Sequence, residues 1–166
     1  MTETSLRNGS RLRDLLALAA FVALCLLVSA IGGAVTATSV GGWYQELEKP
    51  FFTPPDWLFG PVWTVLYLMI AVAGWRIWRL PRSERRTRAL IYYAMQLSLN
   101  LAWSMLFFGA QAIGAAAIEI AILLYAIIRC IALFRPLDRM AAILFAPYAV
   151  WVAYAATLNA AIWLLN

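Results

Sequence analysis

Five long apolar runs divide this chain, and they constrain its fold more than any other feature. They span approximately residues 15–35, 59–78, 89–108, 113–134 and 140–165. Each run is close to the ~20 apolar residues that a helix needs to cross a bilayer. The chain is 64% hydrophobic and 13% charged, so a soluble domain of 166 residues could not bury its apolar surface. The sequence therefore predicts an all-α integral membrane protein.

The predicted domain organisation is one five-helix transmembrane bundle over residues 15–166, preceded by a basic tail over residues 1–14. The tail and the first run together also have the charge pattern of a cleavable signal peptide. However, the run is long for a signal peptide, and four further runs follow it. We therefore expect it to remain as the first membrane helix.

The positions of lysine and arginine predict the orientation of the bundle. Three arginines precede the first run, five follow the second and two follow the fourth, whereas the other connections carry only Lys49. Basic residues concentrate on the cytoplasmic side of membrane proteins. We therefore expect the N-terminus in the cytoplasm, and residues 41–58 and the C-terminus on the opposite side. Because these charges lie at the ends of apolar runs, their expected partners are membrane lipids and not nucleic acid.

The connection between the first two runs, residues 41–58, is rich in proline and aromatic residues. Pro50, Pro54 and Pro55 lack a backbone donor and disfavour helix at the residue before them. A plain tether has no need of the tryptophans, tyrosine and phenylalanines around these prolines. We expect an ordered, non-helical loop that acts as a lid or wall for a flat apolar ligand.

The sequence lacks the usual residues of enzyme and metal sites. It contains no histidine, and its two cysteines, Cys25 and Cys130, both lie inside apolar runs. Such cysteines are typical of buried thiols and not of a disulfide or metal site. No acid–base or nucleophile constellation is apparent. We therefore predict no metal site, no required cofactor and no ordinary catalytic residue.

Polar and aromatic residues share one face of the third run. Gln96, Asn100, Trp103 and Phe107 follow one another in steps of four, three and four, which places them on one side of a helix. Buried amides in a bilayer need partners, so this face should look into the bundle. Two interpretations remain open: the amides hydrogen-bond to neighbouring helices, or they orient a ligand beside an aromatic wall.

Aromatic residues on the second and fifth runs extend this pattern. Trp63 and Tyr67 lie one turn apart directly after the loop, and one face of the fifth run carries Tyr148, Trp151, Ala155 and Asn159. Trp63, Trp103 and Trp151 come from three helices and could converge on one cavity. Aromatic walls with a few polar groups are what a large planar apolar ligand requires.

Glu119 is the one acidic residue deep inside an apolar run. An intramembrane carboxylate marks a candidate functional site, although the side chain could equally stay protonated or reach the outer interface. The small residues before it, Ala110, Gly114 and Ala117, form a face that could pack against a second copy of the chain.

Together these motifs resemble the TspO/MBR family, the tryptophan-rich sensory proteins and translocator (peripheral-type benzodiazepine receptor) proteins. The matching motifs, in chain order, are Trp43-Tyr44, Lys49-Pro50, Thr53-Pro54-Pro55, Pro61-Val62-Trp63, Leu66-Tyr67, Gln96-Leu97, Asn100, Trp103, Phe107-Phe108, Pro147-Tyr148, Trp151, Ala155 and Leu158-Asn159. No basic residue follows Tyr154, where animal members carry a sterol motif, and this departure is typical of bacterial members.

The resemblance implies a five-helix bundle, commonly a homodimer, that binds porphyrins and other hydrophobic small molecules in a pocket capped by the first loop. Carried over residue by residue, that pocket involves Tyr44, Pro54, Trp63, Asn100, Trp103, Trp151 and Ala155. The candidate ligand-binding set is completed by Trp43, Tyr67, Gln96, Phe107 and Tyr148.

Three functions are compatible with these residues. The first is a receptor- or transporter-like protein for tetrapyrroles such as protoporphyrin IX and haem precursors, acting in tetrapyrrole or oxidative-stress regulation. The alternative is light- or oxidant-dependent porphyrin degradation, with Trp63 and Trp151 as redox-active partners. The third is a scaffold in which the aromatic residues only pack.

Overall fold

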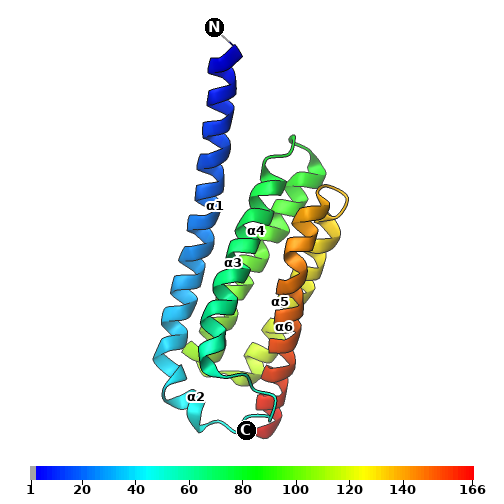
Figure 1. The fold of residues 1–166 in the computed structure, drawn as a ribbon. Coiled ribbons are helices and arrows are strands. Elements are labelled where there is room, and N and C mark those ends of the chain that lie inside the picture. The colour runs from blue at the N-terminus through cyan, green and yellow to red at the C-terminus, as the bar shows by residue number, and fades with distance from the viewer. Residues whose placement is uncertain (1–2) are drawn as a thin grey trace.

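The computed structural model describes the backbone from residue 3 and the side chains from residue 11, and it forms a bundle of long helices (Figure 1). These are α1 (Glu3–Val40), α3 (Phe59–Trp78), α4 (Glu84–Ser104), α5 (Ile113–Phe134) and α6 (Arg139–Leu165). All 5 contain a segment long and apolar enough to cross a membrane, which confirms the predicted all-α, five-span fold. Residues 1–2 of the predicted basic tail, and the side chains of residues 3–10, lie outside the described residues.

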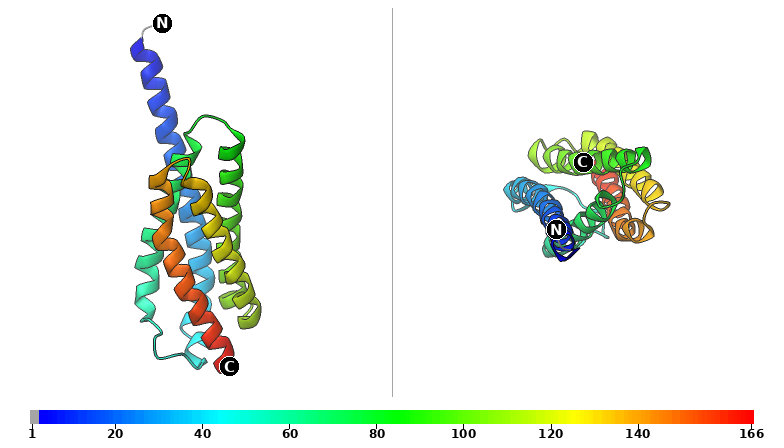
Figure 2. Two further views of the ribbon diagram at one scale, coloured as in Figure 1. Left: turned by 90° about the vertical axis from the view of Figure 1, so that its right-hand side faces the viewer. Right: turned by 90° about the horizontal axis from the view of Figure 1, so that it is seen from above.

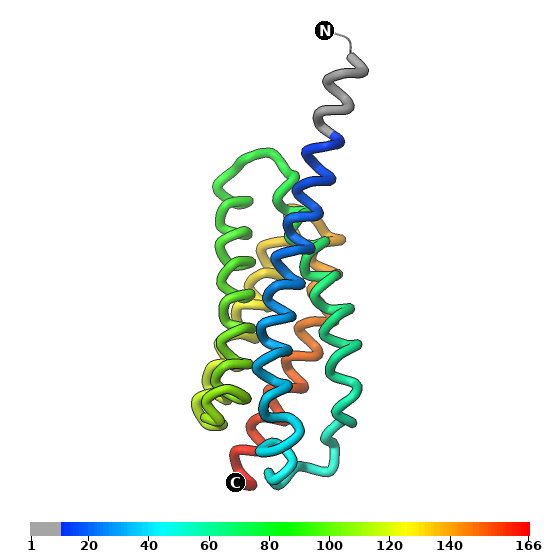
Figure 3. Tube along the Cα trace, turned by 90° about the vertical axis from the view of Figure 1, so that its left-hand side faces the viewer, coloured from blue at the N-terminus to red at the C-terminus, as the bar shows by residue number. Residues whose placement is uncertain are grey.

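The helices form a closed ring when the bundle is viewed along its axis (Figure 2). α1 packs against α3 and α4, α3 packs against α6, and α5 lies between α4 and α6. The order around the ring is therefore α1, α3, α6, α5, α4. The loop that follows α1 lies at the same end of the bundle as the C-terminus (Figure 3).

Local sequence explains where two of these helices begin. The Ser83 side chain caps α4 by accepting a hydrogen bond from the Arg86 amide at 3.2 Å, and Asp138 caps α6 by accepting from the Ala141 amide at 3.1 Å. Asp138 also pairs with Arg76 of α3, with 2.9 Å between carboxylate and guanidinium. Burial alone would raise the pKa of Asp138, but the donors from Ala141 and Arg76 outweigh it, so its pKa is lowered.

A π-helical turn, η2 (Met105–Gly109), continues α4. Its wider hydrogen bond runs from the Ala110 amide to the Met105 carbonyl at 2.7 Å. Gln111 then takes a left-handed φ of 55°, which directs the chain into α5. Such π-turns are frequent at functional sites, and this one directs Phe107 and Phe108 toward the loop at the same end of the bundle.

The loop between α1 and α3 contains the short helix α2 (Trp43–Glu46) and the 3-10 turn η1 (Asp56–Leu58). The predicted non-helical conformation therefore applies to residues 41–42 and to residues 47–55, where the three prolines lie. This segment is held against α6. The Tyr154 hydroxyl donates to the Phe52 carbonyl at 2.6 Å, and the Asn166 side chain exchanges two hydrogen bonds of 3.0 Å with the Glu48 backbone.

Candidate functional site

A cavity of about 370 Å³ lies between α1, α3 and α4, under the loop. Its lining residues are Ser29, Gly32, Gly33, Thr36, Ala37, Val40, Tyr44, Asp56, Phe59, Gly60, Trp63, Thr64, Tyr67, Asn100, Trp103, Ser104 and Phe108. Small-molecule pockets generally measure about 300–1,000 Å³. Aromatic rings and small side chains dominate the lining, and Asp56 is its only charged member. These walls suit a flat, largely apolar ligand.

The wall from α1 was not identified in the sequence analysis. Its lining residues Ser29, Gly33, Thr36 and Val40 recur in steps of three or four along one face of the helix. A Cβ added at Gly33 would meet no atom within 4 Å, so this glycine borders open space. The spacing of small residues along the first apolar run is the signal from which this wall could have been predicted.

Four side chains form a continuous hydrogen-bonded network at the cavity floor, which is the part farthest from the loop. The Tyr67 hydroxyl donates to Asn100 Oδ1, and Asn100 Nδ2 donates to the Tyr148 hydroxyl at 3.0 Å. Tyr148 in turn donates to Gln96 Oε1 at 3.0 Å. Tyr67 and Asn100 line the cavity, whereas Tyr148 and Gln96 are fully buried behind it. Both amides therefore hydrogen-bond to neighbouring helices, as the first interpretation predicted. Because Asn100 also lines the cavity, the ligand-orienting interpretation stays open for Asn100 alone.

Trp63 forms the aromatic wall on the α3 side. Its ring centroid lies 5.6 Å from that of Tyr67 and 6.2 Å from that of Tyr148. The network therefore supports this wall, because two of the rings that contact Trp63 are held by Asn100.

Trp103 forms the aromatic wall on the α4 side. Its ring stacks on Phe107 with a centroid separation of 5.4 Å and an interplanar angle of 27°. Its indole nitrogen donates to Asn159 Oδ1 at 3.0 Å, and Asn159 Nδ2 donates to the Ile113 carbonyl at 3.0 Å. The hydrogen bonds from α5 and α6 thus fix the orientation of this ring.

Tyr44 closes the cavity from the loop and is only 2% exposed. Lys49 Nζ lies 4.4 Å from the Tyr44 ring centroid and donates to Gln45 Oε1 at 3.1 Å, while Gln45 Nε2 donates to Asp56 at 2.8 Å. Burial, followed by the nearby Asp56 and Tyr154, raises the pKa of Tyr44 to about 12. At neutral pH the Tyr44 hydroxyl is therefore protonated.

Two predicted residues, Phe107 and Ala155, lie at a smaller void of about 20 Å³ and do not line the cavity. The void and the cavity share the residues Tyr44, Phe59, Trp103 and Phe108. Ala155, the predicted pocket residue of α6, is therefore separated from the cavity by a layer of aromatic rings.

Three other predicted residues also lie away from the cavity lining. Trp151 packs against Phe59 with centroids 6.0 Å apart, and its buried indole nitrogen has no partner among residues 11–166. Trp43 packs against Phe107 at 5.8 Å, and Pro54 is half-buried in the loop. Of the three tryptophans expected to converge, Trp63 and Trp103 therefore line one space and Trp151 stands behind Phe59.

Comparison with known proteins identifies the same family as the sequence motifs. The model of the TspO/MBR family matches residues 21–164, a range that includes every residue of the cavity lining. This chain belongs to the TspO/MBR family. The resemblance seen in the sequence is thereby confirmed.

Individual relatives in the TspO/MBR family extend over most of the chain. Tryptophan-rich protein TspO of Archaeoglobus fulgidus is 40% identical over 154 residues, 92% of this chain and 99% of the relative. Translocator protein of Sus scrofa is 36% identical over 143 residues, which cover 82% of this chain and 85% of the relative. Protein CrtK of Rhodobacter capsulatus is 32% identical over 146 residues, which cover 87% of this chain and 91% of the relative. With its five spans, this TspO/MBR protein is a multi-pass integral membrane protein.

Proposed function

We propose that this TspO/MBR protein binds tetrapyrroles such as protoporphyrin IX, and other flat hydrophobic molecules, in the cavity under the loop. The observation that carries the proposal is the pairing of aromatic walls with a neutral polar floor around about 370 Å³. The faces of Trp63 and Trp103 are suited to stacking on a macrocycle. In this proposal a polar edge of the ligand hydrogen-bonds to Tyr67 and Asn100, which both line the cavity.

In this proposal the protein acts as a receptor or transporter in tetrapyrrole or oxidative-stress regulation, without a required cofactor and as a homodimer. The N-terminus faces the cytoplasm, and the loop faces the opposite side. Arginine placement supports this orientation, because the arginine-rich α3–α4 and α5–α6 connections lie at the end of the bundle opposite the loop (Figure 1).

The degradation alternative needs Trp63 and Trp151 beside the same ligand. Trp63 lines the cavity, whereas Trp151 is separated from it by Phe59. This separation favours ligand binding over a reaction that uses both tryptophans.

A porphyrin titration of the purified full-length protein tests the proposal. Saturable quenching of porphyrin fluorescence is expected for the wild type. Trp63→Ala should weaken the affinity about tenfold, since it removes a ring face and its apolar area. Trp57→Ala is the matched control, because Trp57 is 71% exposed and does not line the cavity.

An unchanged affinity in Trp63→Ala would reject the assignment of the cavity. Absence of any saturable binding to the wild type would instead support the scaffold interpretation.

A further inference from the structure

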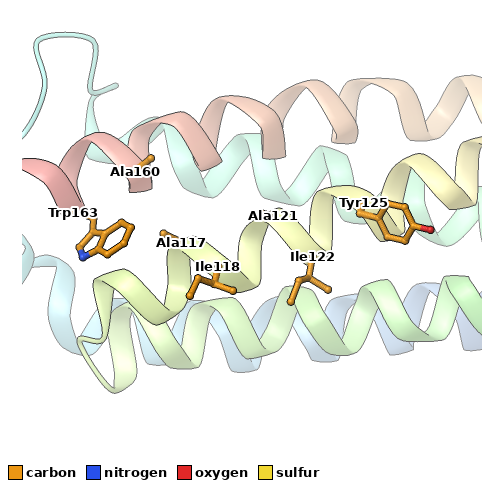
Figure 4. Close-up of a pocket in the computed structure, with 7 residues that line it drawn as sticks. All are labelled: Ala117, Ile118, Ala121, Ile122, Tyr125, Ala160 and Trp163. Carbon is orange, nitrogen blue, oxygen red and sulfur yellow. The ribbon is translucent and has the colours of Figure 1, made fainter.

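A second hollow lies on the lipid-facing side of the α5–α6 pair and shares no residue with the cavity (Figure 4). Its volume is about 610 Å³, and its lining residues are Ala117, Ile118, Ala121, Ile122, Tyr125, Ala160 and Trp163. We call it the α5–α6 groove. Ile118, Ile122 and Trp163 are each more than half exposed, so the groove opens away from the bundle core.

The shape of the α5–α6 groove follows from its small residues. Ala117, Ala121 and Ala160 leave space between Trp163 at one end and Tyr125 at the other (Figure 4). The segment from Ala117 to Tyr125 corresponds to about 12 Å of helix rise. A Cβ at Gly114 would lie 2.9 Å from Trp163 Nε1, so this glycine makes room for the ring that closes the groove.

An arginine without an ion-pair partner lies just beyond the Tyr125 end. Arg129 follows Ile118, Ile122 and Tyr125 in steps of four, three and four, which places it on the same face of α5. Its Nε is buried without a hydrogen-bond partner, and it joins no ion pair within the part of the chain whose side chains are described. Its guanidinium lies 5.8 Å from the Tyr92 ring centroid. Among the described side chains of residues 11–166, this cation therefore has no counter-charge.

Arg129 lies within side-chain reach of the membrane interface. It precedes Phe134, the last residue of α5, by about 8 Å of helix rise, a distance that a flexible arginine can cover to reach the membrane interface. The Tyr125 hydroxyl points away from Trp163, toward the end of α5 where Arg129 lies (Figure 4). Both donors are thus available at the same end of the groove.

We propose that the α5–α6 groove binds a phospholipid with an anionic headgroup, from the leaflet that borders the Phe134 end of α5. Arg129 and Tyr125 donate to the headgroup phosphate, and one acyl chain lies over Ala121 and Ala117 toward Trp163. Ala117 and Arg129 are separated by about 18 Å of helix rise, close to the ~15 Å depth of one leaflet. This site is independent of the proposed tetrapyrrole function.

Charge selects this occupant over a second copy of the chain. A two-fold partner packed along the groove would bring its own arginine to the same face and so add a second positive charge. An anionic phosphate supplies the missing counter-charge, and its acyl chain fills the apolar part of the groove.

Lipid titration of the purified full-length protein in mild detergent tests the site, with native mass spectrometry to count bound lipids. Phosphatidylglycerol should bind saturably and more tightly than phosphatidylcholine. Arg129→Gln should lower the phosphatidylglycerol affinity about fivefold and the phosphatidylcholine affinity less, because the choline cation already balances the phosphate of phosphatidylcholine. Arg139→Gln is the matched control, an exposed arginine at the same end of the bundle. Arg129→Lys, which keeps the charge, should retain most of the affinity.

A second variant tests the acyl-chain part of the α5–α6 groove. Ala121→Phe should reduce the binding of both lipids, whereas Val150→Phe, at a residue 71% exposed on α6, should not. Equal affinity for the two lipids, or the same loss in Arg129→Gln and Arg139→Gln, would overturn headgroup recognition. Normal lipid binding by Ala121→Phe would overturn the proposal that an acyl chain lies in the groove. A dimer that Ala121→Phe abolishes would show that a second copy occupies the groove.

Discussion

Gly33 on α1 and Gly74 on α3 show how the two halves of the bundle differ. An added Cβ at Gly74 would lie 2.4 Å from Tyr93 Cζ, because the tyrosine ring of α4 fills the space that the glycine leaves. At Gly33 nothing lies within 4 Å, and the space remains as part of the cavity. A small residue thus permits close packing in one half and an open site in the other. The side chain on the facing helix decides which.

The half around Gly74 is closed by large side chains. The Tyr93 and Phe145 ring centroids are 6.2 Å apart, and those of Phe134 and Phe145 are 5.0 Å apart. The Tyr93 hydroxyl also lies 3.3 Å from Cys25 Sγ, which joins α1 to α4. This closed half holds the helices together, whereas the loop-covered half contains the cavity.

The largest expected effect on stability comes from replacing each of the two glycines with alanine. Gly74→Ala should lower the free energy of unfolding by about 1–3 kcal/mol, because Tyr93 must move from a closely packed position. Gly33→Ala should change it by no more than about 0.5 kcal/mol. Thermal unfolding of both variants in the same detergent measures the difference. Equal destabilisation would remove the distinction between a closed and an open half.

A smaller effect is expected at the boundary between the halves. Asn100→Ala leaves the hydroxyls of Tyr67 and Tyr148 without their shared partner, which should cost about 1 kcal/mol in a membrane protein. Ser98→Ala is the control, since its hydroxyl bonds only to the Ala94 carbonyl of its own helix. Unfolding in a denaturing detergent titration gives the comparison. Equal stability of both variants would show that the network is dispensable.

The smallest effect is expected at the Arg76–Asp138 pair, at the end of the closed half. The folded-state pKa of Asp138 is lowered, so its stabilisation is present above its unfolded value of about 3.9 and is lost as the pH falls through the folded pKa. Asp138→Asn keeps a capping side chain but removes the charge. The free energy of unfolding of Asp138→Asn should therefore be about 0.5–1 kcal/mol lower than that of the wild type at neutral pH. Its stability should also fall less steeply as the pH is lowered. A pH series of melting temperatures with an identical acid decline in both proteins would contradict this.

The fold was predictable from local sequence, but the helix ends were less so. Apolar runs of membrane-spanning length identified all five long helices. Helix α1 covers Glu3–Val40, compared with the predicted span 15–35, since polar residues outside hydrocarbon can remain helical. Helix α4 begins after the Ser83 cap, five residues before the predicted 89. Hydropathy marks where a helix is buried in lipid, and capping marks where it ends.

The candidate site was predictable in part. Tyr44, Trp63, Tyr67, Asn100 and Trp103 were predicted and line the cavity. Helical spacing also placed residues such as Gln96, Tyr148 and Trp151 on inward faces, but it could not show that other rings separate them from the cavity. The wall from α1 was missed because its residues carry no aromatic or amide group, and they contribute by being small.

The sequence by itself determined the number of membrane spans, the inward faces of the helices and the family. Hydrophobic length, helical periodicity and short motifs are local properties of the chain. Only the tertiary structure decided which inward residues share a cavity. The ring order α1, α3, α6, α5, α4 differs from the chain order, so it places α1 beside α4 and α6 beside α3. Packing then fills the space at Gly74 and leaves the space at Gly33 open, because the size of the facing side chain acts only once the helices meet.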